Sequence, residues 1–358
     1  MMTNISSRKV AQKPKQVIIV LSPGRTGTSL LMQVLRSLGL TLSEQLFGPH
    51  YTNPDGFFED VDILELHKQL LIELGTAQTL PLLEGWMKTD VISSFRPKLR
   101  ALVEDRVSKA ETTWGFKDPR TCGLLPLWID VLKPMWIVPK FVLSTRNPFV
   151  VVPSMMIQGK KMSSEIAELV WLTRTVDALH HTAADCYIVH YEDWFTQSSK
   201  LAQELLRYTG LDEYFTGNVD EALKDIIKPN LNRSVHEDYQ VQNEYVLKLY
   251  NVLKDCRGAD FDRTRLMAVV KECRQAMEGF KGWYLIAQEN IARVSTLREQ
   301  LQTAKEKQAE IPQLQKRIRE LERENQRLSE MEKEILRADK ALNHLQELYP
   351  QNPTQDRL

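Results

Sequence analysis

Long apolar runs, cysteine frameworks and an excess of one charge are all missing from this sequence. No run approaches the roughly 20 apolar residues that span a bilayer, so we expect a cytoplasmic protein with no transmembrane segment. The four cysteines share no spacing typical of a metal site or a disulfide framework, which indicates reduced, structural residues. Lysine plus arginine and aspartate plus glutamate number 47 each, so the chain has no net charge that would attract nucleic acid. An anion site therefore has to be built from a few local residues.

Glycine is missing from the C-terminal part of the chain: all 15 glycines lie at or before Gly282. Upstream, short apolar runs alternate with amphipathic helical patterns. The runs are residues 17–21, 114–116, 141–144 and 187–189. Continuous apolar strands separated by helices are typical of a parallel sheet covered on both faces. We therefore predict an α/β fold in which a central parallel sheet is flanked by helices, with a long C-terminal helical or coiled-coil extension.

Composition also predicts where the parts of the chain begin and end. A helix is expected from about Ser29, ending at Gly39 with a left-handed cap. Further helical patterns cover residues 198–208, 241–253 and 266–286. The expected parts are a flexible basic tail (1–15), a sheet-containing domain (16–285), a helical extension (286–349) and a disordered C-terminus (350–358).

The extension carries a seven-residue apolar repeat. Its members are Leu314, Leu321, Leu328, Ile335, Leu342 and Tyr349, whereas the companion seam positions are Ile318, Asn325, Glu332, Asp339 and Gln346. A seam Asn fixes the register of dimeric coiled coils, but a single amphipathic helix that packs on its own domain or on a partner explains the pattern equally well. The hypotheses are a homodimer or a protein partner bound through residues 289–349. Pro312 is expected to break the helix or to begin a new one.

The turn at residues 22–29, Ser-Pro-Gly-Arg-Thr-Gly-Thr-Ser, lies between the first expected strand and the first expected helix. Such a turn presents backbone N–H groups and the positive end of a helix dipole to one point. Glycine allows close approach, arginine adds a bidentate phosphate donor, and hydroxyls add further donors. The predicted anion cradle consists of Pro23, Gly24, Arg25, Thr26, Gly27, Thr28 and Ser29. The alternative is an ordinary strand-to-helix loop.

A Walker A loop is missing, because Thr28 rather than lysine follows Gly27. No apolar strand ends in a clear Walker B aspartate either. We therefore expect a ligand with a single 5′-phosphate-type group and no metal ion, in place of a triphosphate with Mg²⁺.

A second phosphate element follows the third apolar run. Arg146 comes at its end, Pro148 forces a turn, and Ser154 lies eight residues beyond the arginine, in the next expected helix. One guanidinium and one hydroxyl can converge on a phosphate there. Two phosphate elements imply a nucleotide with two phosphorylated positions, although an Arg-Asn-Pro turn on its own is a weak signal.

These motifs resemble those of the sulfotransferases that use 3′-phosphoadenosine 5′-phosphosulfate (PAPS). The family's 5′-phosphosulfate loop looks like residues 22–29, and its 3′-phosphate element looks like Arg146 with Ser154. The bacterial branch adds two segments that occur here as Gly56-Phe57-Phe58-Glu59 and Lys117-Asp118-Pro119-Arg120, and the family's Tyr-Glu-Asp occurs at 191–193. The resemblance covers residues 15–250 and implies a P-loop-like sulfotransferase fold, PAPS as donor and PAP as product.

The resemblance also implies roles. Sulfuryl would pass to a hydroxyl of a carbohydrate or another glycosylated acceptor. Glu59 would be the general base in place of the catalytic histidine of cytosolic members, Lys117 would reach the transferring group, and Arg25 stands where those members have lysine. Open alternatives are His50 as the base, Asp118 as an orienting residue, and a third phosphate contact from Arg233.

Plainer interpretations remain beside these. The alternative for Glu59 is a solvated loop carboxylate, and the alternative for Lys117 and Arg120 is a structural ion-pair cluster with Asp118. For the whole chain, the alternatives are a P-loop-type small-molecule kinase, which the missing lysine disfavours, and a non-catalytic scaffold that acts through its coiled coil.

Overall fold

The computed structural model describes residues 15–48, 56–158, 162–228 and 239–348. The chain divides into two compact units, Met1–Ala292 and Arg293–Leu358. The strands and α-helices, in chain order, are β1 (Lys15–Leu21), α1 (Thr28–Ser37), α2 (Val61–Glu73), α3 (Asp90–Lys109), β2 (Trp114–Lys117), α4 (Thr121–Leu132), β3 (Ile137–Thr145), α5 (Pro148–Gln158), α6 (Ser164–His181), β4 (Tyr187–His190), α7 (Ser198–Thr209), α8 (Val219–Leu223), α9 (Glu244–Leu253), α10 (Arg263–Glu278) and α11 (Lys281–Leu348).

The sheet has four strands in the order β2-β1-β3-β4, and every pair is parallel. Each strand coincides with one of the apolar runs, so the predicted α/β class with a central parallel sheet is confirmed. In the register of the sheet, Ile19 of β1 lies opposite Phe116 of β2 and Phe141 of β3. Two strands begin earlier than expected: β1 by two residues and β3 by four. In β3 the apolar run was not visible there because Val138 to Lys140 are not buried and include a proline.

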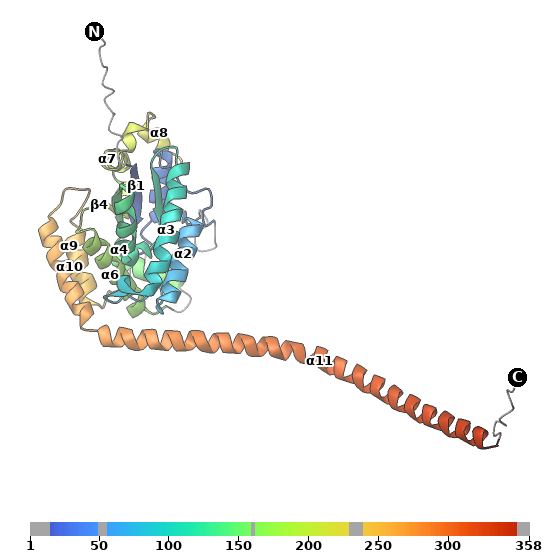
Figure 1. The fold of residues 1–358 in the computed structure, drawn as a ribbon. Coiled ribbons are helices and arrows are strands. Elements are labelled where there is room, and N and C mark those ends of the chain that lie inside the picture. The colour runs from blue at the N-terminus through green and yellow to red at the C-terminus, as the bar shows by residue number, and fades with distance from the viewer. Residues whose placement is uncertain (1–14, 49–55, 159–161, 229–238, 349–358) are drawn as a thin grey trace, which may run out of the picture. The chain divides into compact units, whose positions relative to one another are not determined.

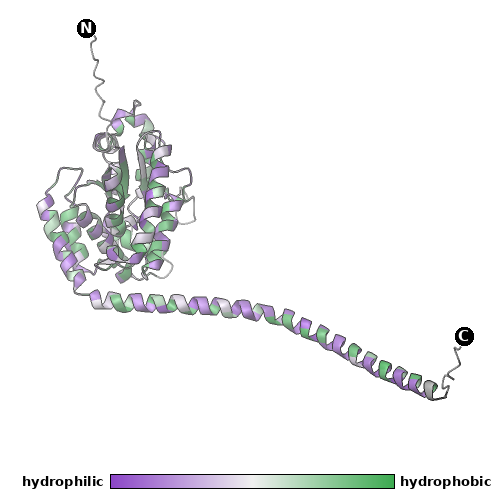
Figure 2. Cartoon of the chain, in the orientation of Figure 1, coloured by the Kyte–Doolittle hydropathy of each residue, from purple (hydrophilic) through white to green (hydrophobic). Residues whose placement is uncertain are grey.

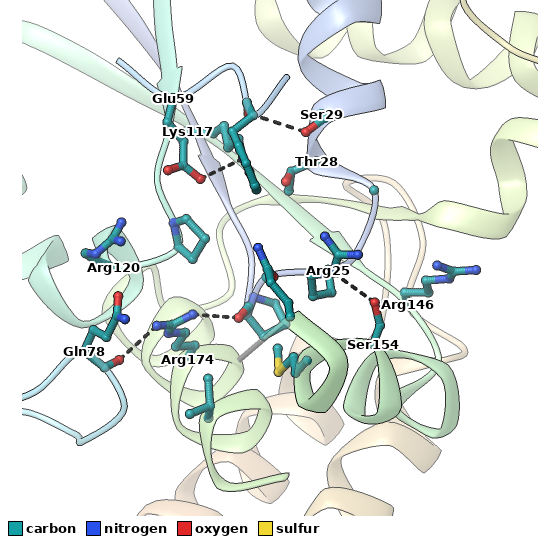
Figure 3. A pocket seen from close by; sticks show the side chains of 18 of the residues that line it. Arg25, Thr28, Ser29, Glu59, Gln78, Lys117, Arg120, Arg146, Ser154 and Arg174 are labelled. Carbon is teal, nitrogen blue, oxygen red and sulfur yellow. Dashed lines mark hydrogen bonds and ion pairs between the residues drawn. The ribbon is translucent and has the colours of Figure 1, made fainter. Parts of the chain in front are cut away.

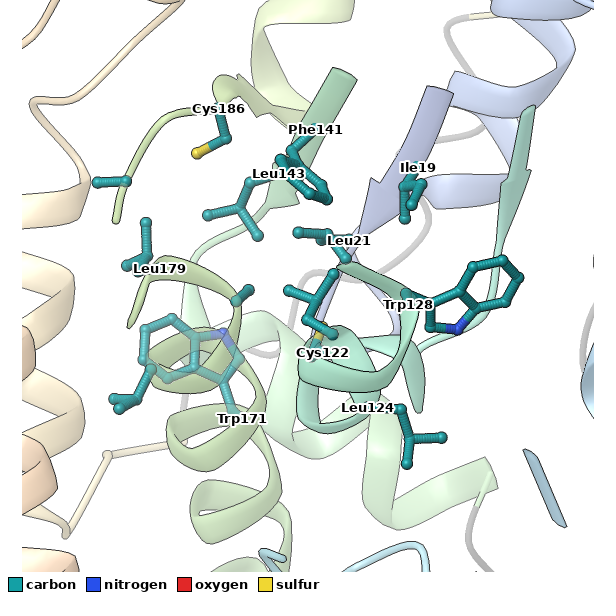
Figure 4. Packing of buried hydrophobic residues seen from close by; sticks show 14 of the residues in the cluster. Ile19, Leu21, Cys122, Leu124, Trp128, Phe141, Leu143, Trp171, Leu179 and Cys186 are labelled. Carbon is teal, nitrogen blue, oxygen red and sulfur yellow. The ribbon is translucent and has the colours of Figure 1, made fainter. Parts of the chain in front are cut away.

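Both faces of the sheet are buried, which explains why its strands are apolar throughout rather than alternating. Residues 17–21 are at most 1% exposed, and they divide between two hydrophobic clusters. Ile19 and Leu21 pack with α4 and α6, around Trp128 and Trp171 (Figure 4). Ile18 and Val20 pack against α1 and α7 on the other face. Figures 1 and 2 show the hydrophobic strands enclosed between helices.

The C-terminal helices differ from the expected pattern at two places. The stretch expected as one helix over 266–286 is divided, because α10 ends at Glu278 and α11 begins at Lys281, with Gly279 between them. The prediction that Pro312 breaks the last helix is wrong: α11 continues through it to Leu348. A proline inside a helix removes one backbone hydrogen bond, and the many bonds on either side retain the helical path.

No helix within the described residues is long and apolar enough to cross a membrane. The four cysteines are all buried and form no disulfide.

Candidate functional site

A pocket of about 580 Å³ opens where the four parallel strands end. The turn after β1 forms one wall, Lys117 ends β2, and Arg146 follows β3 (Figure 3). Tyr191, which follows β4, also lines the pocket. The chain leaves β1 toward β2 and leaves β3 toward β4, so β1 and β3 border the point where the strand order reverses. Ligands of open α/β sheets bind at this kind of crevice.

The pocket brings together nearly all of the residues that the sequence singled out. These are Pro23, Gly24, Arg25, Gly27, Thr28, Ser29, Glu59, Lys117, Arg146 and Ser154. They come from segments up to about 130 residues apart in the chain, which only the parallel sheet brings to one edge.

Thr26 is placed differently from the other turn residues. Its side chain is completely buried, and its hydroxyl donates to Ser144 Oγ at 3.0 Å and lies 2.8 Å from Ser22 Oγ. Ser144 Oγ in turn donates to the Thr26 carbonyl at 2.9 Å, and the Gly24 N–H donates to Ser22 Oγ at 2.8 Å. The expectation of a Thr26 hydroxyl facing an anion is therefore corrected: this hydroxyl fixes the turn to β3.

The turn itself has an unusual backbone. Gly24, Arg25 and Gly27 all have positive φ, at 100°, 61° and 76°. Glycine tolerates this region, whereas an arginine there is strained, and such strain is typical of functional turns. Alternating conformations of this kind form concave sets of N–H groups that bind anions. Helix α1 follows directly at Thr28, with no acidic residue in its first turn to offset the helix dipole.

Gly27 is also required for packing. A Cβ at this position would lie 2.0 Å from Cδ2 of Tyr191, so the aromatic ring occupies the space of a side chain. The guanidinium carbon of Arg146 lies 4.2 Å from the centre of the same ring. Tyr191 thus connects the turn after β1 to the arginine after β3, and its position explains the Tyr-Glu-Asp segment that follows β4.

Cationic side chains dominate the pocket. Six line it, namely Arg25, Lys68, Lys117, Arg120, Arg146 and Arg174, with Glu59 as the only carboxylate among the lining residues. Arg25 Nε donates to Ser154 Oγ at 2.9 Å, which joins the turn to α5. Burial and the neighbouring charge of Arg146 lower the pKa of Arg25. Because like charges that are removed from water repel each other, an anion between them would be stabilised.

Glu59 and Lys117 form a buried ion pair, with Oε1 and Nζ 2.9 Å apart. Glu59 is 8% exposed and Lys117 is 4% exposed. Glu59 is held in place because Asp60 caps α2 and binds Arg106, and because the Phe47 N–H donates to the Glu59 carbonyl at 2.7 Å. Burial excludes the interpretation of Glu59 as a solvated loop carboxylate.

Asp118 lies behind the pocket in a network of its own. Trp128 Nε1 donates to His67 Nε2 at 3.0 Å, so the imidazole proton is on Nδ1, which donates to Asp118 Oδ2 at 2.9 Å. The other carboxylate oxygen accepts from the backbone N–H and Nη1 of Arg120. Burial raises the pKa of Asp118, but the Arg120 charge and the His67 hydrogen bond outweigh it and lower the pKa overall. Asp118 therefore orients Arg120, and Lys117 pairs with Glu59 rather than with Asp118.

Among solved structures, three sulfotransferases are similar to this chain. The sulfotransferase domain of the Synechococcus PCC 7002 olefin synthase is 17% identical, covers 76% of this chain and 98% of its own, and has a TM-score of 0.37. Sulfotransferase STF9 from Mycobacterium avium is 13% identical, with coverages of 60% and 68% and a TM-score of 0.43. Sulfotransferase STF1 from Mycobacterium tuberculosis H37Rv is 17% identical, with coverages of 66% and 76% and a TM-score of 0.43.

These similarities are too weak to bear on function. No protein-family model matches the chain, and no curated protein matches it either.

Sequence reasoning missed Arg174 of α6. Its Nη1 donates to the Pro23 carbonyl and its Nη2 to the Gln78 carbonyl, both at 2.9 Å, so it ties the turn to the loop before α3. Burial lowers its pKa. The sequence signal for this residue was an arginine among the apolar residues of a buried helix. No motif surrounds Arg174, so the sequence did not connect it with the pocket.

Two of the open alternatives, His50 and Arg233, lie outside the described residues. Within the described part of the chain, no group of three or more His, Cys, Asp or Glu residues is arranged to hold a metal ion.

Proposed function

We propose that this chain is a PAPS-dependent sulfotransferase that transfers a sulfuryl group to a hydroxyl of an acceptor. The observation that carries this proposal is the convergence of the glycine turn, Arg25, Arg146 and Ser154 on one cation-rich pocket at the strand ends. Two phosphate elements far apart in the sequence thus border one crevice, as a nucleotide phosphorylated at both its 5′ and 3′ positions requires.

The residues present fit such a donor. Backbone N–H groups of the turn, with Arg25 and Thr28, would hold the 5′-phosphosulfate, while Arg146 and Ser154 would hold the 3′-phosphate. Burial and the charge of Arg146 lower the pKa of Arg25, so a phosphate bound beside Arg25 would stabilise its charged form. The donor supplies a sulfuryl group attached to a phosphate leaving group. The chain supplies positive charge where that phosphate would lie.

Glu59 and Lys117 suit the remaining two tasks. Lys117 holds Glu59 through Oε1, and among the described residues Oε2 has no hydrogen-bond partner, so this oxygen is the proposed acceptor of the hydroxyl proton. Lys117 lies at the end of β2 on the wall of the same pocket, where its ammonium would offset negative charge that builds on the transferring group.

A carbohydrate hydroxyl is the proposed acceptor. The pocket combines apolar aromatic surface with neutral polar side chains, a combination that suits the apolar and hydroxyl faces of a sugar. The residues in question are Phe47, Phe57, Gln33, Gln78 and Thr79.

Thermal unfolding of the full chain with PAP, and separately with ATP and Mg²⁺, tests the donor site. A ligand at a hundred times its dissociation constant stabilises by about 2.7 kcal/mol, so PAP should raise Tm by a few degrees. The shift should be lost in Arg146→Ala and reduced in Ser154→Ala. Arg207→Ala, on the exposed face of α7, is the matched control and should keep the full shift.

The outcomes separate the candidate functions. A shift with ATP and Mg²⁺ alone would support a kinase, and no shift with either nucleotide would support a scaffold. If PAP binds, incubation with PAPS and a panel of oligosaccharides, followed by mass spectrometry for an added sulfate, identifies the acceptor.

A further inference from the structure

The second unit of the chain presents a long apolar stripe on α11. Thirteen large apolar side chains of this unit are between 45% and 59% exposed; Leu336 is one of them, and the other twelve are Val294, Leu297, Leu301, Ile311, Leu314, Ile318, Leu321, Leu328, Met331, Ile335, Leu342 and Leu345. Figure 2 shows hydrophobic positions recurring along the helix between hydrophilic ones. A stripe of this length is typical of a helix that associates with another helix.

The stripe is more regular than a heptad count alone suggests. From Val294 to Leu345 the twelve residues other than Leu336, completed by Ala304, Gln308, Asn325 and Ala338, follow steps of three and four residues in alternation, and Leu336 lies beside them. The alternation fails only at Ile311 and Leu328, where two steps of three follow each other; Pro312 adjoins the first. Glu332 and Asp339, which a strict heptad places in the seam, lie beside it instead.

The order of three-residue and four-residue steps is the same whether it is counted from Val294 or from Leu345. Its midpoint falls between Arg319 and Glu320, and each seam position has a counterpart at equal distance on the other side. In an antiparallel pair of two copies, Val294 therefore meets Leu345, and Ile318 meets Leu321. The two irregular steps coincide as well, because Ile311 meets Leu328, so every seam residue packs against a seam residue.

Charge complementarity fixes the direction of the pair. The charged residues that flank the seam would meet in four combinations of opposite sign and in none of like sign: Arg298 with Asp339, Lys305 with Glu332, Lys307 with Glu334, and Arg317 with Glu324. Each occurs twice by symmetry. Arg317 also reaches Glu320 of its own helix at 3.3 Å, but both side chains are largely exposed there.

A parallel pair in register is less favourable. It would place Arg293 against Arg298 and Glu334 against Asp339, two combinations of like sign, beside only two of opposite sign. Flanking charges set the orientation of coiled coils, so they select the antiparallel arrangement.

We propose that two copies of this chain associate through residues 294–345 as an antiparallel coiled coil, with a two-fold axis between Arg319 and Glu320. Such an interface is self-complementary, because residue i of one copy meets residue j of the other and the reverse. The proposal does not depend on the sulfotransferase activity.

Sedimentation of the full chain tests whether the dimer forms. The expected mass is about twice the 41.4 kDa of one chain. Leu321→Asp, near the axis, should give monomers, whereas Gln326→Asp, on the outward face of the same helix, should remain dimeric. A wild-type monomer at micromolar concentration would overturn the proposal.

Engineered cysteines test the direction. Leu297→Cys and Leu342→Cys are co-expressed with different tags and then oxidised; the native cysteines are buried. The antiparallel pair predicts a disulfide between the two variants and little in either variant alone, since the facing residue is then leucine. A disulfide between two Leu297→Cys copies would show a parallel pair and overturn the assignment.

Exchanging one charged pair gives an independent check. Lys307→Glu would face Glu334 twice in the dimer and should raise Kd about tenfold, and adding Glu334→Lys should restore it. In a parallel pair Lys307 faces Pro312, so the first change would have little effect on Kd and the pattern would contradict the proposal.

Discussion

Lys117 Nζ lies 2.9 Å from Glu59 Oε1 in a pair that is almost completely enclosed, although one residue ends β2 and the other precedes α2. Buried ion pairs contribute little net stability, but breaking one by removing a single partner leaves an uncompensated charge. Because the pair lies on the wall of the cation-rich pocket, we propose that it has a chemical task rather than a structural one.

Glu59→Gln should lower turnover without loss of donor binding. The amide cannot take a proton from a hydroxyl, so kcat should fall by about 10² to 10⁴, whereas Kd for PAP should change by no more than about threefold. Isothermal titration and a single-turnover assay measure the two quantities. Loss of PAP binding in parallel with kcat would show that Glu59 shapes the donor site instead of serving as base.

Lys117→Met should destabilise the fold by about 3 kcal/mol, because Glu59 is left buried without its cation. The surface pair of Glu65 and Lys68 on α2, with N and O 2.7 Å apart, supplies the control. Glu65→Gln should change the free energy of unfolding by less than about 0.5 kcal/mol. If urea denaturation gave the same loss of unfolding free energy for Lys117→Met and Glu65→Gln, burial of the Glu59–Lys117 pair would not matter for stability.

Gly27→Ala should be far more harmful than Gly39→Ala. Both glycines have positive φ, but a Cβ at Gly39 has nothing within 4 Å, whereas at Gly27 it would lie 2.0 Å from the Tyr191 ring. Strain alone costs about 1–2 kcal/mol. The displaced ring would also shift Arg146, so we expect at least tenfold weaker PAP binding for Gly27→Ala only. If Gly27→Ala and Gly39→Ala bound PAP with similar affinity, displacement of the Tyr191 ring would not affect the donor site.

Arg174→Lys should weaken the pocket while keeping its charge. An ammonium cannot donate in the same geometry to the Pro23 and Gln78 carbonyls, so we expect a loss of about 1–2 kcal/mol in stability and a several-fold rise in Kd for PAP. Arg96→Lys, in an exposed pair with Asp130, is the control and should alter neither. An unchanged Kd for PAP in Arg174→Lys would mean that only the positive charge of this residue matters for binding, and not its hydrogen bonds.

Asp177 of α6 should make stability fall as pH rises. Burial raises its pKa to about 7, although the charge of Arg274 opposes this. The raised pKa means that its stabilising contribution is complete below the unfolded pKa near 3.8 and is lost as pH rises to about 7. The free energy of unfolding of Asp177→Asn, relative to that of the wild type, should therefore be up to about 4 kcal/mol higher at pH 8 than at pH 4. Urea unfolding of both proteins at the two pH values measures this difference. A difference that does not depend on pH would contradict this.

Much of the sheet was predictable because its strands are buried on both faces. The four apolar runs located β1 to β4, and the glycine turn, Arg146 and Ser154 all line the pocket at the strand ends. Each of these signals is local: a run, a turn, or a short spacing within one strand and its helix.

What the sequence did not predict depends on contacts between distant segments. The burial of the Thr26 hydroxyl depends on Ser144 in a neighbouring strand, and the pairing of Glu59 with Lys117 depends on where β2 ends. Arg174 bridges two loops from a helix that carries no motif. Helix α11 continued through Pro312 because one lost hydrogen bond is small against a helix of 68 residues.

Each strand of the sheet contributes to the same pocket, through the turn after β1, Lys117, Arg146 and Tyr191. An anion seated there would link all four strand ends, so no strand could detach while the anion remained bound. Amide hydrogen exchange should show this as a common slowing of β1 to β4, including the two edge strands β2 and β4. The pocket would then govern the cooperativity of the sheet as well as its chemistry.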